Sequence, residues 1–352
     1  MVENASQYDG PLPPSGSRPA STGMFRILVC LDRSELCETV FSYAVMLARA
    51  VGGSLTLMHV VESSGDPSSE SHDALLWELK HHEARQYMGQ LQERISRLNV
   101  PVDIQIEEGR AAEQILSFIR QHPVDFVILA SHGTHGLAEW GLSGTAAKIV
   151  GRTHSSFIIV PATPVYQHEQ QESCVRRILV PLDDSLSSQA ALPMAIRIAR
   201  QQHAELILAH AIEPTSFKNY SGISYADREI IDAASSVLAS VAQDYFHQIA
   251  TRLQSEGVKV SVIVTPNSSP IELIYEIVAS RDIDFIAMSA HGSSKSEQCP
   301  LARTSAHMAT HTPVPLLIVQ DLDREQISRA LQKQRYDSAP LKCSESASDD
   351  TT

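Results

Sequence analysis

The strongest constraint on the fold of this chain is an internal duplication. The segment ILVCLDRS at residues 27–34 returns as ILVPLDDS at residues 178–185, an offset of 151 positions. Further along the chain, DFVI at 125–128 and FIIV at 157–160 return as DFIA and LLIV, both at an offset of 159. A chain of 352 residues has room for two domains of ordinary size. The duplication therefore predicts one architecture present in two copies.

Composition limits the classes of partner. The chain is 43% hydrophobic and 20% charged, which is typical of a globular protein, and its formal charge of -13 argues against nucleic acid as a partner. No apolar run approaches the roughly 20 residues of a membrane-spanning helix, and no secretory signal is visible. Five cysteines without a ligand spacing predict reduced thiols and no metal site. These features predict a cytoplasmic protein that binds neither nucleic acid nor a membrane.

The two copies are expected to be separated and flanked by polar segments. Residues 1–23, rich in Pro, Ser and Gly, are predicted to form a disordered tail. The copies are predicted at residues 24–162 and 174–321, with a linker over 163–173. Residues 322–352 are predicted to be a polar, mostly disordered tail.

Apolar patterning predicts the architecture of each copy. Short continuous apolar runs alternate with segments of helical periodicity, which is typical of parallel strands covered on both faces. The strands of the first copy are expected at 25–31, 55–60, 102–106, 125–130 and 156–160. Each copy is thus predicted to be a Rossmann-like α/β domain, a five-stranded parallel sheet between helices.

Each copy also contains one long helix, whose apolar stripe is expected to face the sheet. In the first copy this helix is expected at 74–98, and in the second at 230–253. The expected stripes consist of Leu75, Leu79, Leu91, Ile95 and Leu98 in the first and of Val237, Val241, Tyr245, Ile249 and Leu253 in the second.

The candidate site lies at the carboxyl ends of the strands, where open parallel sheets bind ligands at the reversal of strand order. Asp32 and Asp183 follow the first strand of each copy. After the fourth strand of the first copy, the loop ASHGTHG at 130–136 leads to Gly144-Thr145 at a helix start. Glycines let backbone amides approach an oxyanion, and a helix start adds donors. This pattern predicts a phosphate site, with an aspartate placed for a ribose hydroxyl or an adenine amino group.

Other nucleotide and hydrolase motifs are absent from the sequence. It contains no G-x-x-x-x-G-K-[ST], no G-x-G-x-x-G after the first strand and no G-x-S-x-G. His132 and His291 recur beside the loop glycine, and two roles stay open for them: packing or bonding to the backbone, or contact with a phosphate.

Taken together, the I-L-V-x-L-D-x-S opening of both copies, the loop glycines and the repeat resemble the universal stress protein family, here as a tandem of two domains. The resemblance implies an adenine-nucleotide-binding fold of the adenine nucleotide α-hydrolase-like type, in which domains commonly pair. It implies that Asp32 approaches adenine or ribose, that Val60 lines the adenine pocket, and that Gly133, Gly144 and Thr145 hold phosphates. The full set implied at the nucleotide is Leu31, Asp32, Val60, Ala130, His132, Gly133, Gly144, Thr145 and Ala146.

The two copies depart from the family's loop pattern, G-x2-G-x9-G-[ST], to different degrees. In the first copy Ala130 replaces the first glycine, and ten residues rather than nine separate Gly133 from Gly144. In the second copy Gly292 is kept, and the Gly-Thr pair reads Ala302-Arg303. Nucleotide is therefore expected mainly in the first domain. The corresponding second-domain residues are Asp183, Ala211, Ser289, Gly292, Ala302 and Arg303.

The sequence thus predicts a stress-response protein that binds ATP, or AMP or ADP, with Mg²⁺, and acts as a sensor or modulator through a protein partner. Two alternatives stay open. One is a slow ATP hydrolase, for which His132 or His135 are candidates to position water and no catalytic residue is assigned. The other is a scaffold in which neither site binds nucleotide. The two domains are expected to pair within the chain, which is then either a monomer or a homodimer.

Overall fold

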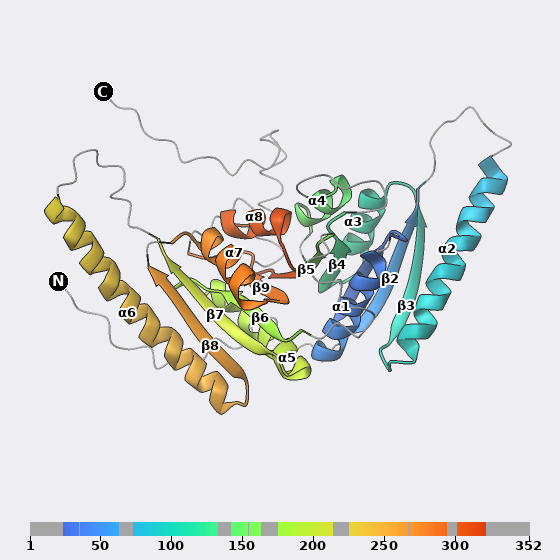
Figure 1. Cartoon of the computed structure of the whole chain (residues 1–352). Helices are drawn as coiled ribbons and strands as arrows, with labels where there is room; N and C mark the ends of the chain where they lie inside the picture. Colours follow the sequence, from blue (N-terminus) through green and yellow to red (C-terminus); the bar gives the residue numbers. More distant parts are fainter. Residues whose placement is uncertain are drawn as a thin grey trace, which may run out of the picture.

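The computed structural model describes residues 24–34, 36–62, 73–132, 142–153, 155–162, 175–213, 225–266, 268–293 and 301–321. Two α/β halves lie side by side in it (Figure 1). The predicted tails and the whole of the predicted linker lie outside the described residues.

The first half is the predicted five-stranded parallel sheet, with strand order β3-β2-β1-β4-β5. Its elements are β1 (Arg26–Leu31), α1 (Leu36–Val51), β2 (Ser54–Val61), α2 (Asp73–Ser96), β3 (Val102–Glu108), α3 (Ala111–Gln121), β4 (Phe126–Ala130), α4 (Gly144–Val150) and β5 (Ser156–Val160).

The second half repeats this arrangement, with strand order β8-β7-β6-β9-β10, and adds a 3-10 turn before its first helix. Its elements are β6 (Arg177–Pro181), η1 (Ser188–Ala191), α5 (Leu192–Gln202), β7 (Glu205–Ile212), α6 (Tyr225–Ser255), β8 (Lys259–Pro266), α7 (Pro270–Arg281), β9 (Phe285–Ser289), α8 (Arg303–His311) and β10 (Leu316–Val319). The α/β architecture predicted from the apolar runs is confirmed.

The two halves pair within the chain. Strands β5 and β10 lie antiparallel, with Ile158 opposite Leu317, and this pairing joins the two sheets into one of ten strands (Figure 1). The ring of Tyr43 in α1 stacks on Phe285 of the other half, with centroids 5.9 Å apart. The backbone N–H of Gln320 donates to Ser156 Oγ at 3.1 Å. Backbone pairing, ring stacking and a side-chain bond therefore all cross the boundary between the copies.

Helices cover both faces of the ten-stranded sheet. Buried residues of α1, α2, α5 and α6 form the core on one face, and those of α3, α4, α7 and α8 form the core on the other. The central strands are apolar throughout because both of their faces are covered.

The predicted stripes of the two long helices are wrong except toward their C-terminal ends. Leu75 and Leu79 of α2 are 78% and 52% exposed, and Val237, Val241 and Tyr245 of α6 are 63%, 62% and 37% exposed. Ile95 and Leu253 near the helix ends are buried. Helix α6, with 31 residues, spans about 46 Å, whereas an eight-residue strand spans only about 26 Å. The N-terminal parts of these helices extend beyond the sheet, as Figure 1 shows, and their described apolar side chains therefore have no core to face.

Candidate functional site

The predicted site residues of the first half meet where its strand order reverses, between β1 and β4. Strands β2, β1 and β4 are neighbours and parallel, so their carboxyl ends lie at one edge of the sheet. Asp32 follows β1, Val60 lies near the end of β2, and Ala130 ends β4. Val60 is half-buried against the core on the α3 and α4 face. The structure therefore brings together three residues that are up to 98 positions apart in the sequence.

The carboxylate of Asp32 is held by the turn that follows it. Its Oδ1 accepts the backbone N–H of Ser34 at 3.0 Å and the thiol of the buried Cys37 at 3.4 Å. Burial is the main cause that raises the pKa of that thiol. Arg33, which lies between Asp32 and Ser34, adopts a left-handed φ of 66°. Its guanidinium pairs with Glu83 of α2 at 3.1 Å. Backbone strain of this kind concentrates at functional sites.

A histidine fixes the backbone just before the aspartate in both halves. His59 Nδ1 lies 2.8 Å from the carbonyl oxygen of Leu31, and His210 Nδ1 lies 2.8 Å from that of Leu182. Because a carbonyl only accepts, the imidazole Nδ1 carries the proton. Burial lowers the pKa of His59, which favours this neutral ring. Leu31 thus contributes its carbonyl to this bond, while its side chain is buried in the core.

The far side of the first site is formed by the start of α4. The backbone N–H of Ser143 donates to Ser131 O at 2.7 Å, which ties this helix to the end of β4. Ser143 Oγ caps the helix by accepting the N–H of Ala146, whose own side chain is buried. Gly144 is exposed, and a Cβ added there would meet nothing within 4 Å. Thr145 is half-buried beside it.

The histidine after β4 is tied to its neighbouring serine. His132 Nδ1 lies 2.9 Å from Ser131 Oγ, which also accepts the N–H of Ala162. Its Nε2 is buried and has no hydrogen-bond partner within the described part of the chain. Gly133 itself belongs to residues 133–141, which lie outside the described residues.

The second half has the same loop length as the first, which changes the residue correspondence expected from the sequence. The N–H of Ala302 donates to Ala290 O at 2.9 Å, the counterpart of the bond from Ser143, and α8 begins at Arg303 as α4 begins at Gly144. Gly144 thus corresponds to Arg303, and Thr145 to Thr304. Thr304 is the residue that the sequence comparison missed, and keeping the offset of 159 constant would have found it.

In the second half, the loops that follow β6 and β9 donate hydrogen bonds to the carboxylate of Asp183. Asp183 Oδ1 accepts from the N–H of Ser185 at 2.9 Å and from its hydroxyl at 2.5 Å, and Oδ2 accepts the N–H of Ser293 at 2.6 Å. A Cβ on Gly292 would collide with Oδ2. Burial raises the pKa of Asp183, but the bonds from Ser185 and Ser293 outweigh burial, so the pKa lies below its ordinary value.

The second loop histidine takes a bonding role. His291 Nδ1 lies 2.7 Å from Asp321 Oδ1, and both side chains are buried. Asp321 matches Ala162 of the first half, which has no carboxylate. There, His132 Nδ1 is hydrogen-bonded to Ser131 Oγ instead. Of the two roles left open for this histidine, hydrogen bonding within the fold is what the second half shows.

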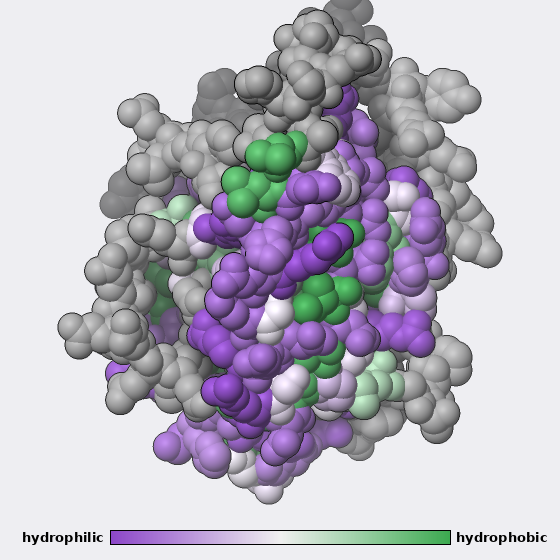
Figure 2. All heavy atoms as spheres, turned by 90° about the vertical axis from the view of Figure 1, so that its right-hand side faces the viewer, coloured by the Kyte–Doolittle hydropathy of each residue, from purple (hydrophilic) through white to green (hydrophobic). Residues whose placement is uncertain are grey.

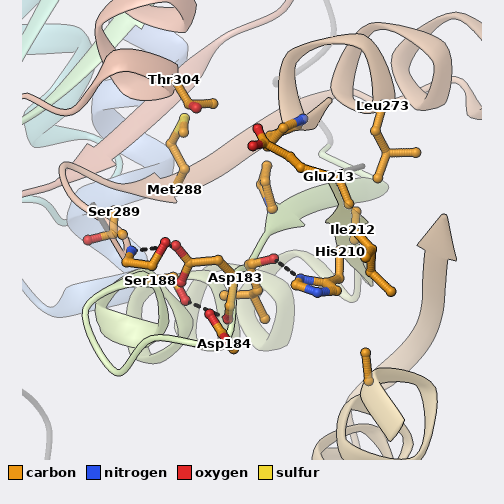
Figure 3. A pocket seen from close by; sticks show the side chains of 18 of the residues that line it. Asp183, Asp184, Ser188, His210, Ile212, Glu213, Leu273, Met288, Ser289 and Thr304 are labelled. Carbon is orange, nitrogen blue, oxygen red and sulfur yellow. Dashed lines mark hydrogen bonds between the residues drawn. The ribbon is translucent and has the colours of Figure 1, made fainter. Parts of the chain in front are cut away.

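A pocket of about 600 Å³ lies at the carboxyl ends of β6, β7 and β9 (Figure 3). Of the six second-domain residues named from the sequence, five line it and only Arg303, which is exposed, does not. Its lining also includes apolar side chains of α6 and α7 and the half-buried Thr304. The corresponding crevice of the first half borders residues 133–141 and is only partly described.

Comparison with known proteins decides the family. The sequence pattern of the universal stress protein family matches residues 24–161 and again residues 175–320. The chain belongs to the universal stress protein family. Its two matches place this protein among the tandem members, with one match in each half of the ten-stranded sheet.

Relatives and solved structures agree with this assignment. The chain is 24% identical over 151 residues to universal stress protein Sll1388 of Synechocystis, and 25% identical over 148 residues to YxiE of Bacillus subtilis. These matches span 39% and 41% of this chain and 98% of each relative, so each relative has about the length of one domain.

Among solved structures, a universal stress protein from Archaeoglobus fulgidus has a TM-score of 0.56 at 17% identity, covering 84% of this chain and 98% of its own. A functionally unknown protein, PA1789 of Pseudomonas aeruginosa, has a TM-score of 0.57 at 11% identity, covering 89% and 98%. At these identities the likeness shows the fold alone. Within the described residues of this protein, no helix has the length and apolarity needed to cross a membrane.

Proposed function

We propose that this universal stress protein binds an adenine nucleotide in its first domain, and that it acts in the stress response as a sensor or modulator through a protein partner. ATP with Mg²⁺ is the proposed ligand, and AMP or ADP are the alternatives. The observation that carries the proposal is the convergence of Asp32, Val60 and Ala130 at the strand switch point, the usual ligand position in open parallel sheets.

The start of α4 supports a phosphate at the same edge. Gly144 leaves open space where the backbone would approach an anion, and Thr145 follows it with a hydroxyl. In the second domain Arg303 stands at the position of Gly144. The space available for phosphate thus favours the first domain.

Charges near the aspartate favour the first domain as well. Arg33 follows Asp32, and Lys80 lies one turn before Glu83, the ion-pair partner of Arg33. The strand registers align α2 with α6 at an offset of 158, so that Met88 matches Phe246 and both are buried. At this offset the counterpart of Lys80 is Leu238, and at the offset of 151 that relates the first strands the counterpart of Arg33 is Asp184. The first domain therefore carries two basic residues on these elements, of which Arg33 is paired with Glu83, and the second domain carries none at the matching positions.

A scaffold role receives support from the first half of α2. Leu75, Trp77 and Leu79 are exposed there by 78%, 42% and 52%. On the face that carries α2, apolar side chains form separate patches among hydrophilic ones (Figure 2). Exposed apolar patches mark interaction surfaces, and we place the protein partner here.

Isothermal titration calorimetry of the full chain with ATP and Mg²⁺ tests nucleotide binding. We expect Gly144→Trp to abolish the heat, because the indole fills the space next to the loop. The matched variant Arg303→Trp, at the same position of the second domain, should bind as the wild type does. Absence of heat with the wild type, or equal loss in both variants, would refute the proposal. Turnover of ATP that Gly144→Trp leaves unchanged would exclude hydrolysis at this site.

A further inference from the structure

The pocket of the second domain differs in charge from what a nucleotide requires. Three carboxylates line it, those of Asp183, Asp184 and Glu213, and its described lining contains no lysine or arginine. ATP carries several negative charges, and like charges repel strongly where water is partly excluded. Asp32 and Glu62 match two of these carboxylates in the first domain, so the distinguishing change is Asp184 in place of Arg33, which disfavours polyphosphate here and favours a positively charged group.

The walls of the same pocket are apolar. Leu238, Val241 and Phe246 come from α6, Leu273 from α7 and Met288 from β9 (Figure 3). Small-molecule sites of about 300–1,000 Å³ are usually lined in this way, with a few polar groups that orient the ligand. A pocket of about 600 Å³ accommodates a molecule with one or two rings.

One polar atom in the wall of the pocket is left without a bond. Ser289 is only 5% exposed, and its Oγ has no hydrogen-bond partner among the described residues. This hydroxyl belongs to the wall of the pocket, and its oxygen is buried there rather than open to the cavity. The first domain has no such hydroxyl, because Ala130 occupies the matching position.

The carboxylate nearest the strand ends is fixed in place. Asp183 receives bonds from Ser185 and Ser293 and is packed against Gly292. Its negative charge therefore stays at the pocket without rearrangement, and a ribose hydroxyl would have to compete with the loop for the same oxygens.

We propose that the pocket of the second domain binds a small, largely apolar molecule that carries a positive charge, such as an aromatic amine, and that it rejects nucleotides. Its ring lies among the apolar side chains of α6, α7 and β9, and its ammonium group faces the three carboxylates. In this proposal the nucleotide site of the first domain and the pocket of the second domain prefer ligands of opposite charge, although both lie on the same ten-stranded sheet.

Matched indole probes test this proposal with the full chain. Tryptamine and indole-3-acetate share a ring system and differ in the sign of their charge, so their affinities, measured by calorimetry, report the charge preference of the pocket. We expect tryptamine to bind at least about tenfold more tightly than indole-3-acetate. In the double variant Asp184→Arg, Leu238→Lys, which introduces the charges of the first domain at exposed positions, this preference should disappear or reverse.

Two further variants locate the binding. Val241→Trp, at a side chain that is 62% exposed and lines the pocket, should weaken tryptamine binding by obstructing the pocket. Glu276→Arg, which reverses a charge as Asp184→Arg does but on the exposed face of α7 outside the pocket, should leave tryptamine binding unchanged. The proposal is overturned if tryptamine does not bind, if indole-3-acetate binds equally well, or if the Val241 and charge variants bind tryptamine as the wild type does.

Discussion

The two halves of this universal stress protein share the same sheet and helix arrangement and differ at the carboxyl ends of their strands, where the candidate sites lie. Each half has an aspartate that accepts the backbone N–H at the start of its first strand, Asp125 for Arg26 and Asp284 for Arg177, both at 2.9 Å. The histidine bond to the carbonyl before the site aspartate also recurs at the same length. These contacts are repeated because both copies need them to shape the sheet.

What is not repeated lies around the pocket. Arg33 and Lys80 correspond to Asp184 and Leu238, Gly144 corresponds to Arg303, and Ala130 to Ser289. The differences therefore fall on charge, space and hydrogen bonding at one edge of the sheet. The comparison teaches that duplication preserved the fold and left each copy free to acquire its own ligand.

The largest expected effect separates the two aspartates. Asp32→Ala removes charge-assisted hydrogen bonds to a nucleotide in the first domain, and we expect ATP affinity to fall about tenfold to a hundredfold. Asp183→Ala should leave ATP affinity within about twofold of wild type, since ATP does not bind in the second domain in this account. Calorimetry of both variants measures the difference, and an equal loss in both would mean that the two sites are alike.

A smaller effect distinguishes the two loop glycines. Gly292→Ala forces a Cβ against the bound Asp183 carboxylate, and we expect the free energy of unfolding to fall by about 1–3 kcal/mol. Gly144→Ala meets no atom within 4 Å and should be neutral or stabilise the protein by up to about 1 kcal/mol. Denaturant unfolding of both variants measures this. Comparable destabilisation by the two changes would show that the second loop is not clamped.

The smallest expected effect concerns pH. Burial lowers the pKa of His59 from its ordinary value of 6.5, so the unfolded chain binds a proton more readily than the folded one. The stability from this histidine is fully present above pH 6.5 and is lost as the pH falls below that value. His59→Asn, which keeps a side-chain donor but does not titrate, should reduce the loss of stability between pH 7.5 and 5.5.

His210→Asn is the matched control for this measurement, because it changes the equivalent ring in the second half while leaving the titration of His59 in place. Unfolding midpoints at the two pH values give the comparison. A pH dependence that is the same in wild type and His59→Asn would assign the effect to other groups.

Much of the fold follows from the sequence because the strands are buried on both faces and read as continuous apolar runs. The family resemblance, applied to the two copies, also implied the internal pairing, but the apolar residues of β5 and β10 do not show that these strands join in antiparallel fashion. The sequence could not predict which apolar residues of α2 and α6 are buried. Periodicity reveals an apolar stripe on a helix, but it does not reveal how far the sheet extends beneath that helix.

The site was predictable where motif residues follow strands, as with Asp32 and Asp183. It was missed at the start of α8, where a slip of one position paired Gly144 with Ala302 and concealed Thr304, although the constant offset of 159 would have identified it. The apolar wall of the second pocket also escaped notice, because Leu238 and Val241 lie on a helix about 50 positions from the loop they face. Only folding brings these side chains to the ends of β6 and β9.

The central claim, that the two copies of one frame hold different sites, is tested most directly by counting nucleotides. Native mass spectrometry of the full chain at saturating ATP and Mg²⁺ reports how many molecules bind to each chain. The account predicts one bound nucleotide in the wild type and none in Gly144→Trp. Two nucleotides per wild-type chain, or none, would contradict it.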